Sequence, residues 1–201
     1  MNTMQNCGQI VILNGMPRSG KTTIASAIQT RFPGLWISLC AGAPRSEPTV
    51  GRGAEDAGTA GLPPLSPAHA ALYEATALYS RMGLNVVADF GLNGRATRAP
   101  GLLAHCAGRL SAYPVLLVGL RNLSSDLTRS RRRDGTAAQA LFRRADDATP
   151  LLPGAWRRPG LYDMELDTDV LTPTECADAI LERLDRGIPR PTALERVAGR
   201  A

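Results

Sequence analysis

Mostly apolar runs alternate with amphipathic segments along the chain, and this pattern predicts an α/β fold. The runs at positions 10–13, 35–40, 84–89 and 115–120 are typical of strands buried in a parallel sheet. Residues 162–167 alternate between apolar and acidic side chains, which predicts a fifth strand at an edge of the sheet, with one face in water. Strands separated by helical segments favour parallel pairing. The expected architecture therefore has three layers, a five-stranded parallel sheet flanked by helices.

Apolar residues at helical spacing predict helices between these strands, over 22–32, 67–82 and 95–109. The last helix has the clearest start, because Thr172 offers an N-cap, Pro173 occupies the first helical position and Glu175 the third. The segment after Gly187 contains two prolines. We expect this C-terminal tail, 187–201, either to fray or to add one helical turn over 193–197.

Two long segments stand apart from this pattern. Residues 41–67 are rich in Gly, Pro, Ala and Ser, which predicts a flexible loop, and loops of this length are usually functional or disordered. Residues 122–148 include an Arg-rich helical region that is broken at Asp134 and Gly135. The chain has no internal repeat and no linker, so its 201 residues are expected to form a single domain.

The chain is basic, with a formal net charge of +5, but this charge does not require a nucleic-acid partner. An enzyme that handles phosphates also needs local positive charge. Lys21 is the only lysine among 23 basic residues, and biased codon usage explains this excess of arginine equally well. The four cysteines are widely spaced, which favours reduced thiols over disulfides or zinc. No segment has the pattern of a signal peptide or a membrane span, and we expect a cytoplasmic protein.

One motif carries the chemistry. Residues 15–22, Gly-Met-Pro-Arg-Ser-Gly-Lys-Thr, fit the P-loop pattern G-x-x-x-x-G-K-[S/T] and lie between a predicted strand and a predicted helix. Glycines let successive N–H groups converge on a phosphate, and the helix N-terminus adds positive charge. Lys21 is expected to reach the β and γ phosphates, and the Thr22 hydroxyl to ligate Mg²⁺. The residues predicted to bind nucleotide are Gly15, Arg18, Ser19, Gly20, Lys21, Thr22 and Thr23.

Further polar residues follow the predicted strands. Asp89 ends the third strand, where its carboxylate is expected to hold Mg²⁺ through water, to accept a proton from a substrate hydroxyl, or only to cap the next turn. After the fourth strand, Arg129 and Arg133 are spaced to share one helix face. They are candidates to close over a transferring phosphoryl group, and the alternative is a solvated basic face. Arg121, at the end of the fourth strand, is a further candidate.

These residues resemble the chloramphenicol phosphotransferase-like family of P-loop kinases, relatives of shikimate and nucleotide kinases. The similar stretches are 12–22, 28–29, 33–36, 87–89, 92–94, 117–121 and 162–168. The resemblance implies an ATP- and Mg²⁺-dependent transfer of the γ-phosphoryl group to a hydroxyl of a small molecule, with antibiotic inactivation as one known outcome. The lid pattern of the family is similar to Arg129 and Arg133, which implies a lid over about 122–148.

The sequence departs from the family at one important position. The family carries an acidic residue soon after its Trp-containing strand, implied as general base toward the acceptor hydroxyl, and counting from Trp36 this position is Gly42. Glycine cannot accept a proton. Either no strong base is needed, or the protein binds nucleotide without phosphotransfer, or another acid takes the role, from among Asp89, Glu47, Glu55 and Asp56. A weak base is physically reasonable, because phosphoryl transfer depends mainly on positioning and charge stabilisation.

The leading prediction is therefore a small-molecule kinase that uses ATP and Mg²⁺ and acts on a hydroxyl acceptor. The alternative is a nucleotide-binding regulatory or degenerate P-loop protein without phosphotransfer. No membrane partner is expected, and a homo-oligomer is compatible with the sequence.

Overall fold

The computed structural model describes residues 7–15, 18–40, 67–92, 101–122 and 160–199, and the strands within these ranges form one five-stranded sheet. Its order is β2-β3-β1-β4-β5, and every neighbouring pair is parallel. The strands are β1 (Ile10–Gly15), β2 (Trp36–Cys40), β3 (Asn85–Asp89), β4 (Val115–Arg121) and β5 (Met164–Asp167). The predicted fold class is confirmed, and β5 lies at an edge, as its alternating pattern predicted.

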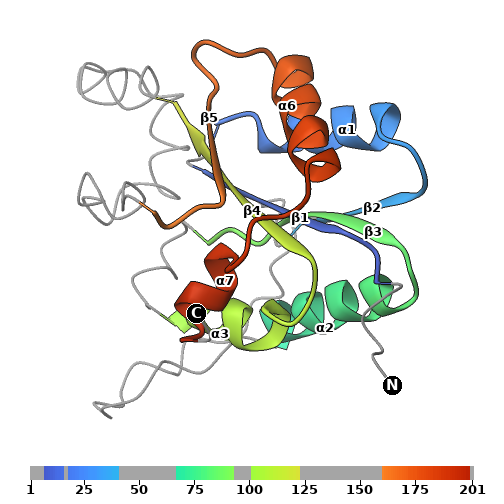
Figure 1. Cartoon of the computed structure of the whole chain (residues 1–201), viewed down its shortest axis with the longest axis vertical. Helices are drawn as coiled ribbons and strands as arrows, with labels where there is room; N and C mark the ends of the chain where they lie inside the picture. The colour runs from blue at the N-terminus through green and yellow to red at the C-terminus, as the bar shows by residue number, and fades with distance from the viewer. Residues whose placement is uncertain (1–6, 16–17, 41–66, 93–100, 123–159, 200–201) are drawn as a thin grey trace, which may run out of the picture.

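Helices cover both faces of the sheet (Figure 1). On one face α1 packs beside α6, and the other face carries α2, α3 and α7. Their bounds are α1 (Lys21–Arg31), α2 (Pro67–Arg81), α3 (Gly101–Leu110), α6 (Pro173–Asp185) and α7 (Ala193–Val197). Parallel neighbours need crossover connections that run over the faces, and this requirement produces the three layers.

Two apolar cores form, one on each face, because successive residues of a strand point to opposite sides of the sheet. On β1, Ile10 and Ile12 face α2, α3 and α7, whereas Val11 and Leu13 face α1 and α6. All four side chains are at most 1% exposed. β1 is therefore the centre of the molecule, and its last residue lies at the carboxyl edge of the sheet, where open α/β sheets bind their ligands.

Part of the C-terminal tail packs against the core through α7. α7 begins with a capping box, in which the Thr192 hydroxyl accepts a hydrogen bond from the Glu195 N–H. Ala193 and Leu194 are buried in the core shared with α3 and β4. Of the two outcomes expected for the tail, the added helical turn is correct for these residues and fraying is wrong, because the apolar side chains gain free energy by leaving water.

Several predicted features lie outside the described residues. These are the loop over 41–67 apart from Pro67, which begins α2, and the region over 122–148 apart from Asn122. The same holds for a set of candidate site residues: Gly42, Glu47, Glu55, Asp56, Arg129 and Arg133. All four cysteines are described, and each is a thiol outside any disulfide. None of the helices in the described ranges has the length and apolarity that crossing a membrane requires.

The burial of α7 predicts a stability cost for Leu194→Ala. Removing this fully buried side chain should lower the free energy of unfolding by about 2–5 kcal/mol, because it leaves a cavity beside α3. Val197→Ala on the exposed side of the same helix should change it by no more than about 0.5 kcal/mol. Urea unfolding followed by circular dichroism measures both variants, and equal stability of the two would show that α7 is not part of the core.

Candidate functional site

Residues 18–20 form a turn that leads into the start of α1. Gly15 is the last residue of β1, and α1 begins at Lys21. Gly20 has a φ of 83° and Arg18 a φ of 70°, so both adopt the left-handed conformation. Glycine does so freely, but for a residue with a side chain it costs on the order of 1–3 kcal/mol. Strain of this kind persists where the surroundings hold it in place, and it concentrates at ligand sites.

The N-terminus of α1 lacks the side-chain cap that other helices of the protein have. α6 and α7 begin with capping boxes, formed by Thr172 with Glu175 and by Thr192 with Glu195. At α1 the N-cap is Gly20, and no side-chain hydrogen bond caps the helix. The N–H groups of its first turn are therefore available as donors to an anion, and the helix adds partial positive charge at the same point.

Lys21 bridges the ends of two neighbouring strands. Its Nζ donates a hydrogen bond to the Gly15 carbonyl oxygen at 2.8 Å and lies 3.9 Å from Oδ2 of Asp89. Burial lowers the pKa of Lys21, and the attraction of the Asp89 carboxylate partly opposes this shift. The ammonium group is thus fixed beside the first turn of α1, where both could meet the same anion.

Asp89, the last residue of β3, makes two different contacts. Its Oδ1 accepts a hydrogen bond from the Gly91 N–H at 3.0 Å, which is the turn-capping contact considered from the sequence. Its Oδ2 faces Lys21. Burial raises the pKa of Asp89, and Lys21 and the Gly91 hydrogen bond partly oppose the shift. The carboxylate is therefore a better proton acceptor than an ordinary aspartate, and one of its oxygens belongs to the site.

The turn closes tightly around Gly15. A Cβ atom on Gly15 would lie 2.7 Å from Ser19 Oγ and 2.8 Å from the Leu120 carbonyl oxygen, closer than real Cβ atoms come. Ser19 is only 1% exposed, and its Oγ has no hydrogen-bond partner in the described part of the chain. A buried hydroxyl without a partner costs free energy, and an oxygen-rich ligand in the turn would supply one. The residues present thus fit a phosphate group.

The turn and Asp89 together line an open pocket at the carboxyl edge of the sheet. Its lining residues are Arg18, Gly20, Lys21, Thr22, Thr23 and Asp89. Thr22 and Thr23 are exposed on the first turn of α1, so their hydroxyl oxygens can reach a ligand. An ammonium group and open N–H donors suit phosphate oxygens, while a hydroxyl and a carboxylate suit a hard cation such as Mg²⁺. The structure therefore brings these six sequence-predicted residues together, and their role in binding a nucleotide stays a prediction.

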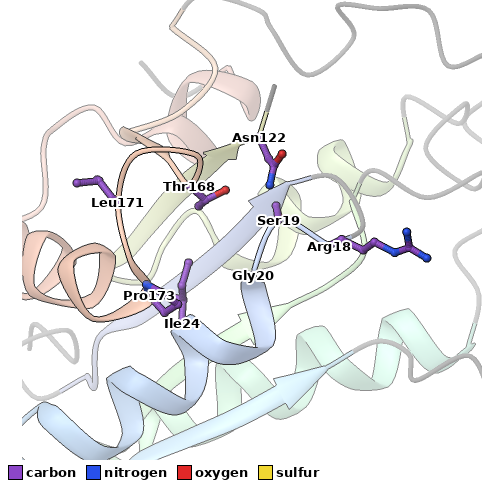
Figure 2. Close-up of a pocket in the computed structure, with 8 residues that line it drawn as sticks. All are labelled: Arg18, Ser19, Gly20, Ile24, Asn122, Thr168, Leu171 and Pro173. Carbon is purple, nitrogen blue, oxygen red and sulfur yellow. The ribbon is translucent and has the colours of Figure 1, made fainter. Parts of the chain in front are cut away.

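A second pocket adjoins the first, and the two share Arg18 and Gly20 (Figure 2). Its further lining residues are Ser19 and Ile24, Asn122 just after β4, and Thr168, Leu171 and Pro173 before or at the start of α6. In Figure 2 the Arg18 side chain points away from the other labelled side chains. Asn122 and Thr168 were not predicted from the sequence. The signal was present, because both directly follow the carboxyl ends of neighbouring strands.

Arg121, also considered from the sequence, lies at the end of β4 and forms an ion pair with Glu165 of β5, with 3.7 Å between the charged atoms. Both side chains are exposed, so the pair contributes little to stability. It lines neither of the two pockets described above. Arg129 and Arg133 lie outside the described residues and stay predictions.

Comparison with known proteins agrees with this fold. The family model described as chloramphenicol phosphotransferase-like protein matches residues 8–185, which confirms the resemblance seen in the sequence. No curated protein sequence matches the chain significantly. The solved structure of APE1195 has a TM-score of 0.55 at 15% identity, covering 92% of this chain and 99% of its own. The APS kinase CysC of Mycobacterium tuberculosis, in complex with AMPPNP and APS, has a TM-score of 0.53 at 15% identity, covering 89% and 98%. At this identity the likeness shows a shared P-loop kinase fold.

The raised pKa of Asp89 predicts a pH-dependent gain of stability for Asp89→Asn. A carboxyl whose folded pKa lies above its ordinary value costs stability once the pH exceeds the ordinary value, and the cost is complete above the raised value. The variant should therefore have a higher urea midpoint than the parent protein at pH 8, with a difference that shrinks as the pH approaches 4. Asp185→Asn, at an exposed position of α6, is the matched control. A difference that grows on acidification would contradict the prediction.

Proposed function

Because the chain belongs to the chloramphenicol phosphotransferase-like family, we propose that it transfers the γ-phosphoryl group of ATP to a hydroxyl of a small molecule, with Mg²⁺ as cofactor. The observation that carries the proposal is the position of Lys21, between the Gly15 carbonyl and the Asp89 carboxylate and beside the uncapped N-terminus of α1. A partly buried ammonium group and open helix N–H donors at one point are what a polyphosphate requires.

The nucleotide is proposed to lie along both pockets. Its phosphates fit the turn around Gly20 and Lys21, where the donors converge. Its base and sugar fit the adjoining pocket, where Ile24 and Leu171 offer apolar contact and Thr168 a hydroxyl. The APS kinase of similar fold was solved with AMPPNP, an ATP analogue, which supports an ATP-type ligand for this fold.

Two residues are proposed to hold the cation. The Thr22 hydroxyl would ligate Mg²⁺ directly, and Asp89 would hold it through water. When bound, Mg²⁺ neutralises negative charge on the β and γ phosphates. Lys21 adds a second positive charge on these oxygens, and its contacts with Gly15 and Asp89 fix the ammonium before the nucleotide arrives.

In the proposed reaction the acceptor oxygen bonds to the γ-phosphorus while the bond from that phosphorus to the bridging oxygen breaks, and ADP is released. The hydroxyl proton passes to a carboxylate or to water. Asp89 is one candidate, because burial raises its pKa and makes it a better proton acceptor. Glu47, Glu55 and Asp56 are the other candidates, and a weak base suffices if the transition state is loose.

Gly42 favours a second candidate function, nucleotide binding without phosphotransfer. The family position implied as general base has no carboxylate in this chain, while the phosphate-binding turn has every residue type that its motif requires. A regulatory or degenerate relative would keep the turn and lose the acceptor chemistry. The two functions differ in one observable, the appearance of phosphate on an acceptor.

Incubation with γ-labelled ATP, Mg²⁺ and a panel of small hydroxyl compounds tests this difference. We expect label on at least one compound, and Lys21→Met should reduce its rate of formation by at least about 100-fold, because the developing charge on the phosphates loses its ammonium partner. Arg31→Met is the matched control, since it removes a positive charge from the exposed end of the same helix. Tight binding of AMPPNP without any labelled acceptor supports the second function, and full activity of Lys21→Met removes Lys21 from the mechanism.

Asp89→Asn separates the two roles proposed for this carboxylate. If Asp89 accepts the proton, kcat should fall by about 10²–10⁴-fold with little change in nucleotide affinity. If it supports the cation, the Mg²⁺ concentration needed for half-maximal activity should rise. Steady-state kinetics over a Mg²⁺ series measures both quantities, and a variant unchanged in both would leave Asp89 only its turn-capping contact with Gly91.

An antibiotic as the acceptor, a cytoplasmic location and the absence of a nucleic-acid partner stay predictions from the sequence. Label on a hydroxylated antibiotic in the same panel tests the first of these. The oligomeric state is open, and size-exclusion chromatography with light scattering measures it directly.

A further inference from the structure

A hydrogen bond reaches the end of β1 from a part of the chain that neither pocket includes. Asn14, the residue before Gly15, donates from its Nδ2 to the Tyr162 hydroxyl oxygen at 3.0 Å. Asn14 is 6% exposed and follows Ile10 and Ile12 in the strand alternation, so it faces the α2, α3 and α7 side of the sheet. α1 packs on the other face, and its first residue, Lys21, donates to the Gly15 carbonyl. The last two residues of β1 are thus contacted from both sides of the sheet.

The ring of Tyr162 packs directly on Gly119, and this brings its hydroxyl within reach of Asn14. Gly119 of β4 pairs with Asn14 in the sheet. A Cβ atom at Gly119 would lie 2.6–2.8 Å from three carbon atoms of the Tyr162 ring, so the ring rests directly on the β4 backbone. Any side chain at position 119 would displace the ring and separate its hydroxyl from Asn14. Glycine here is required by close approach and not by a turn.

The backbone around Tyr162 is in turn held by α7 and the segment before it. The Arg196 guanidinium donates to the carbonyl oxygens of Gly160 and Tyr162, at 3.1 and 3.3 Å. The Asp163 carboxylate, whose side chain is 0% exposed, accepts from the Ala193 N–H at 2.6 Å and from the Leu117 N–H at 2.9 Å. One buried carboxylate therefore ties the start of α7 to β4 next to Tyr162. All of α7 lies beyond residue 185, where the family match ends.

We propose that Tyr162 is a positioning residue for the phosphate site, which fixes Asn14 and through it the Gly15 carbonyl that holds Lys21, and that α7 holds Tyr162 in place. The inference rests on the proposed function, because it assumes that Lys21 serves a bound nucleotide.

The sheet itself explains why this end of β1 needs support. β1 pairs with β3 only from Ile10 to Ile12, whereas its pairing with β4 continues to Gly15. The last three residues of β1 are therefore held by a ladder on one side only. The Asn14–Tyr162 hydrogen bond adds a second attachment at this point, one residue from the carbonyl that accepts from Lys21. A shift of Gly15 moves the ammonium group with it, and charge stabilisation of a phosphate is steeply dependent on distance.

Tyr162→Phe tests the proposal with the smallest change, since it removes the hydroxyl and keeps the ring on Gly119. Titration calorimetry with AMPPNP and Mg²⁺ should show about three- to ten-fold weaker binding than the parent protein, the size expected for one lost hydrogen bond. Tyr113→Phe is the matched control, because it removes a hydroxyl that accepts from Arg81 on the exposed surface. Its affinity should equal that of the parent protein.

A double-mutant cycle separates positioning from general stability. Asn14→Ala and Tyr162→Phe should each weaken AMPPNP binding, and the double variant should be no weaker than the worse single variant, because both remove the same hydrogen bond. All four proteins are titrated at a temperature where unfolding curves show them fully folded. Coupling in the unfolding free energy with unchanged nucleotide affinity would assign the bond a structural role only and overturn the proposal.

Two further variants test the two supports of Tyr162. Gly119→Ala should weaken binding at least as much as Tyr162→Phe, because the added methyl displaces the ring. Arg196→Met, which removes the hydrogen bonds to Gly160 and Tyr162 together with the ion pair to Asp163, should weaken it by a smaller factor. Arg186→Met, at the exposed C-cap of α6, should leave it unchanged. If the parent protein itself does not bind AMPPNP, the proposed function fails. If the parent binds and Tyr162→Phe, Gly119→Ala and Arg196→Met bind equally well, the positioning role fails alone.

Discussion

The site depends on one partly buried ammonium group held beside the open end of a helix. Its hydrogen bond to Gly15 ties Lys21 to the central strand, and its ion pair with Asp89 ties it to the neighbouring strand. Burial works against the charged form of both side chains, lowering the pKa of Lys21 and raising that of Asp89. A ligand that supplies both phosphate oxygens and a cation relieves both costs. The residues that lower the stability of the unliganded protein are therefore the ones that favour ligand binding.

The sequence predicted the local elements and the overall architecture, but not the contacts between segments that are distant in the chain. The strands and α6 could be predicted because apolar runs and a Thr-Pro-x-Glu start act over a few residues. The P-loop residues could be predicted because the spacing within the motif alone specifies a phosphate-binding turn between a strand and a helix. Asn122 and Thr168 were missed because they become neighbours only when β4 and β5 pair. The place of α7 was left open because two prolines argue for a loose tail, and nothing within the segment reveals that α3 leaves room for Leu194.

The two substrates of the proposed reaction depend on different kinds of residue. The nucleotide half depends on backbone conformation and on missing side chains, as at Gly20, with its positive φ, and at Gly15. A single substitution at either position would strain the backbone or clash with neighbouring atoms, so these features are difficult to change one residue at a time. For the acceptor half we expect dependence on side-chain identity among residues 41–66, where Gly42 stands at the position that the family resemblance implies to be acidic. Proteins built in this way can change the acceptor while keeping one way of holding phosphate.

The location of α7 also determines where the chain can be truncated without exposing its core. The family match ends at residue 185, yet Ala193 and Leu194 fill the interior beside α3, and the Ala193 N–H satisfies the buried carboxylate of Asp163. A polypeptide that ended at the family boundary would leave an apolar side of α3 facing water, and the Asp163 carboxylate would keep the Leu117 N–H but lose the Ala193 N–H. Such a fragment would be prone to aggregate, although every residue of its nucleotide-binding motif is intact.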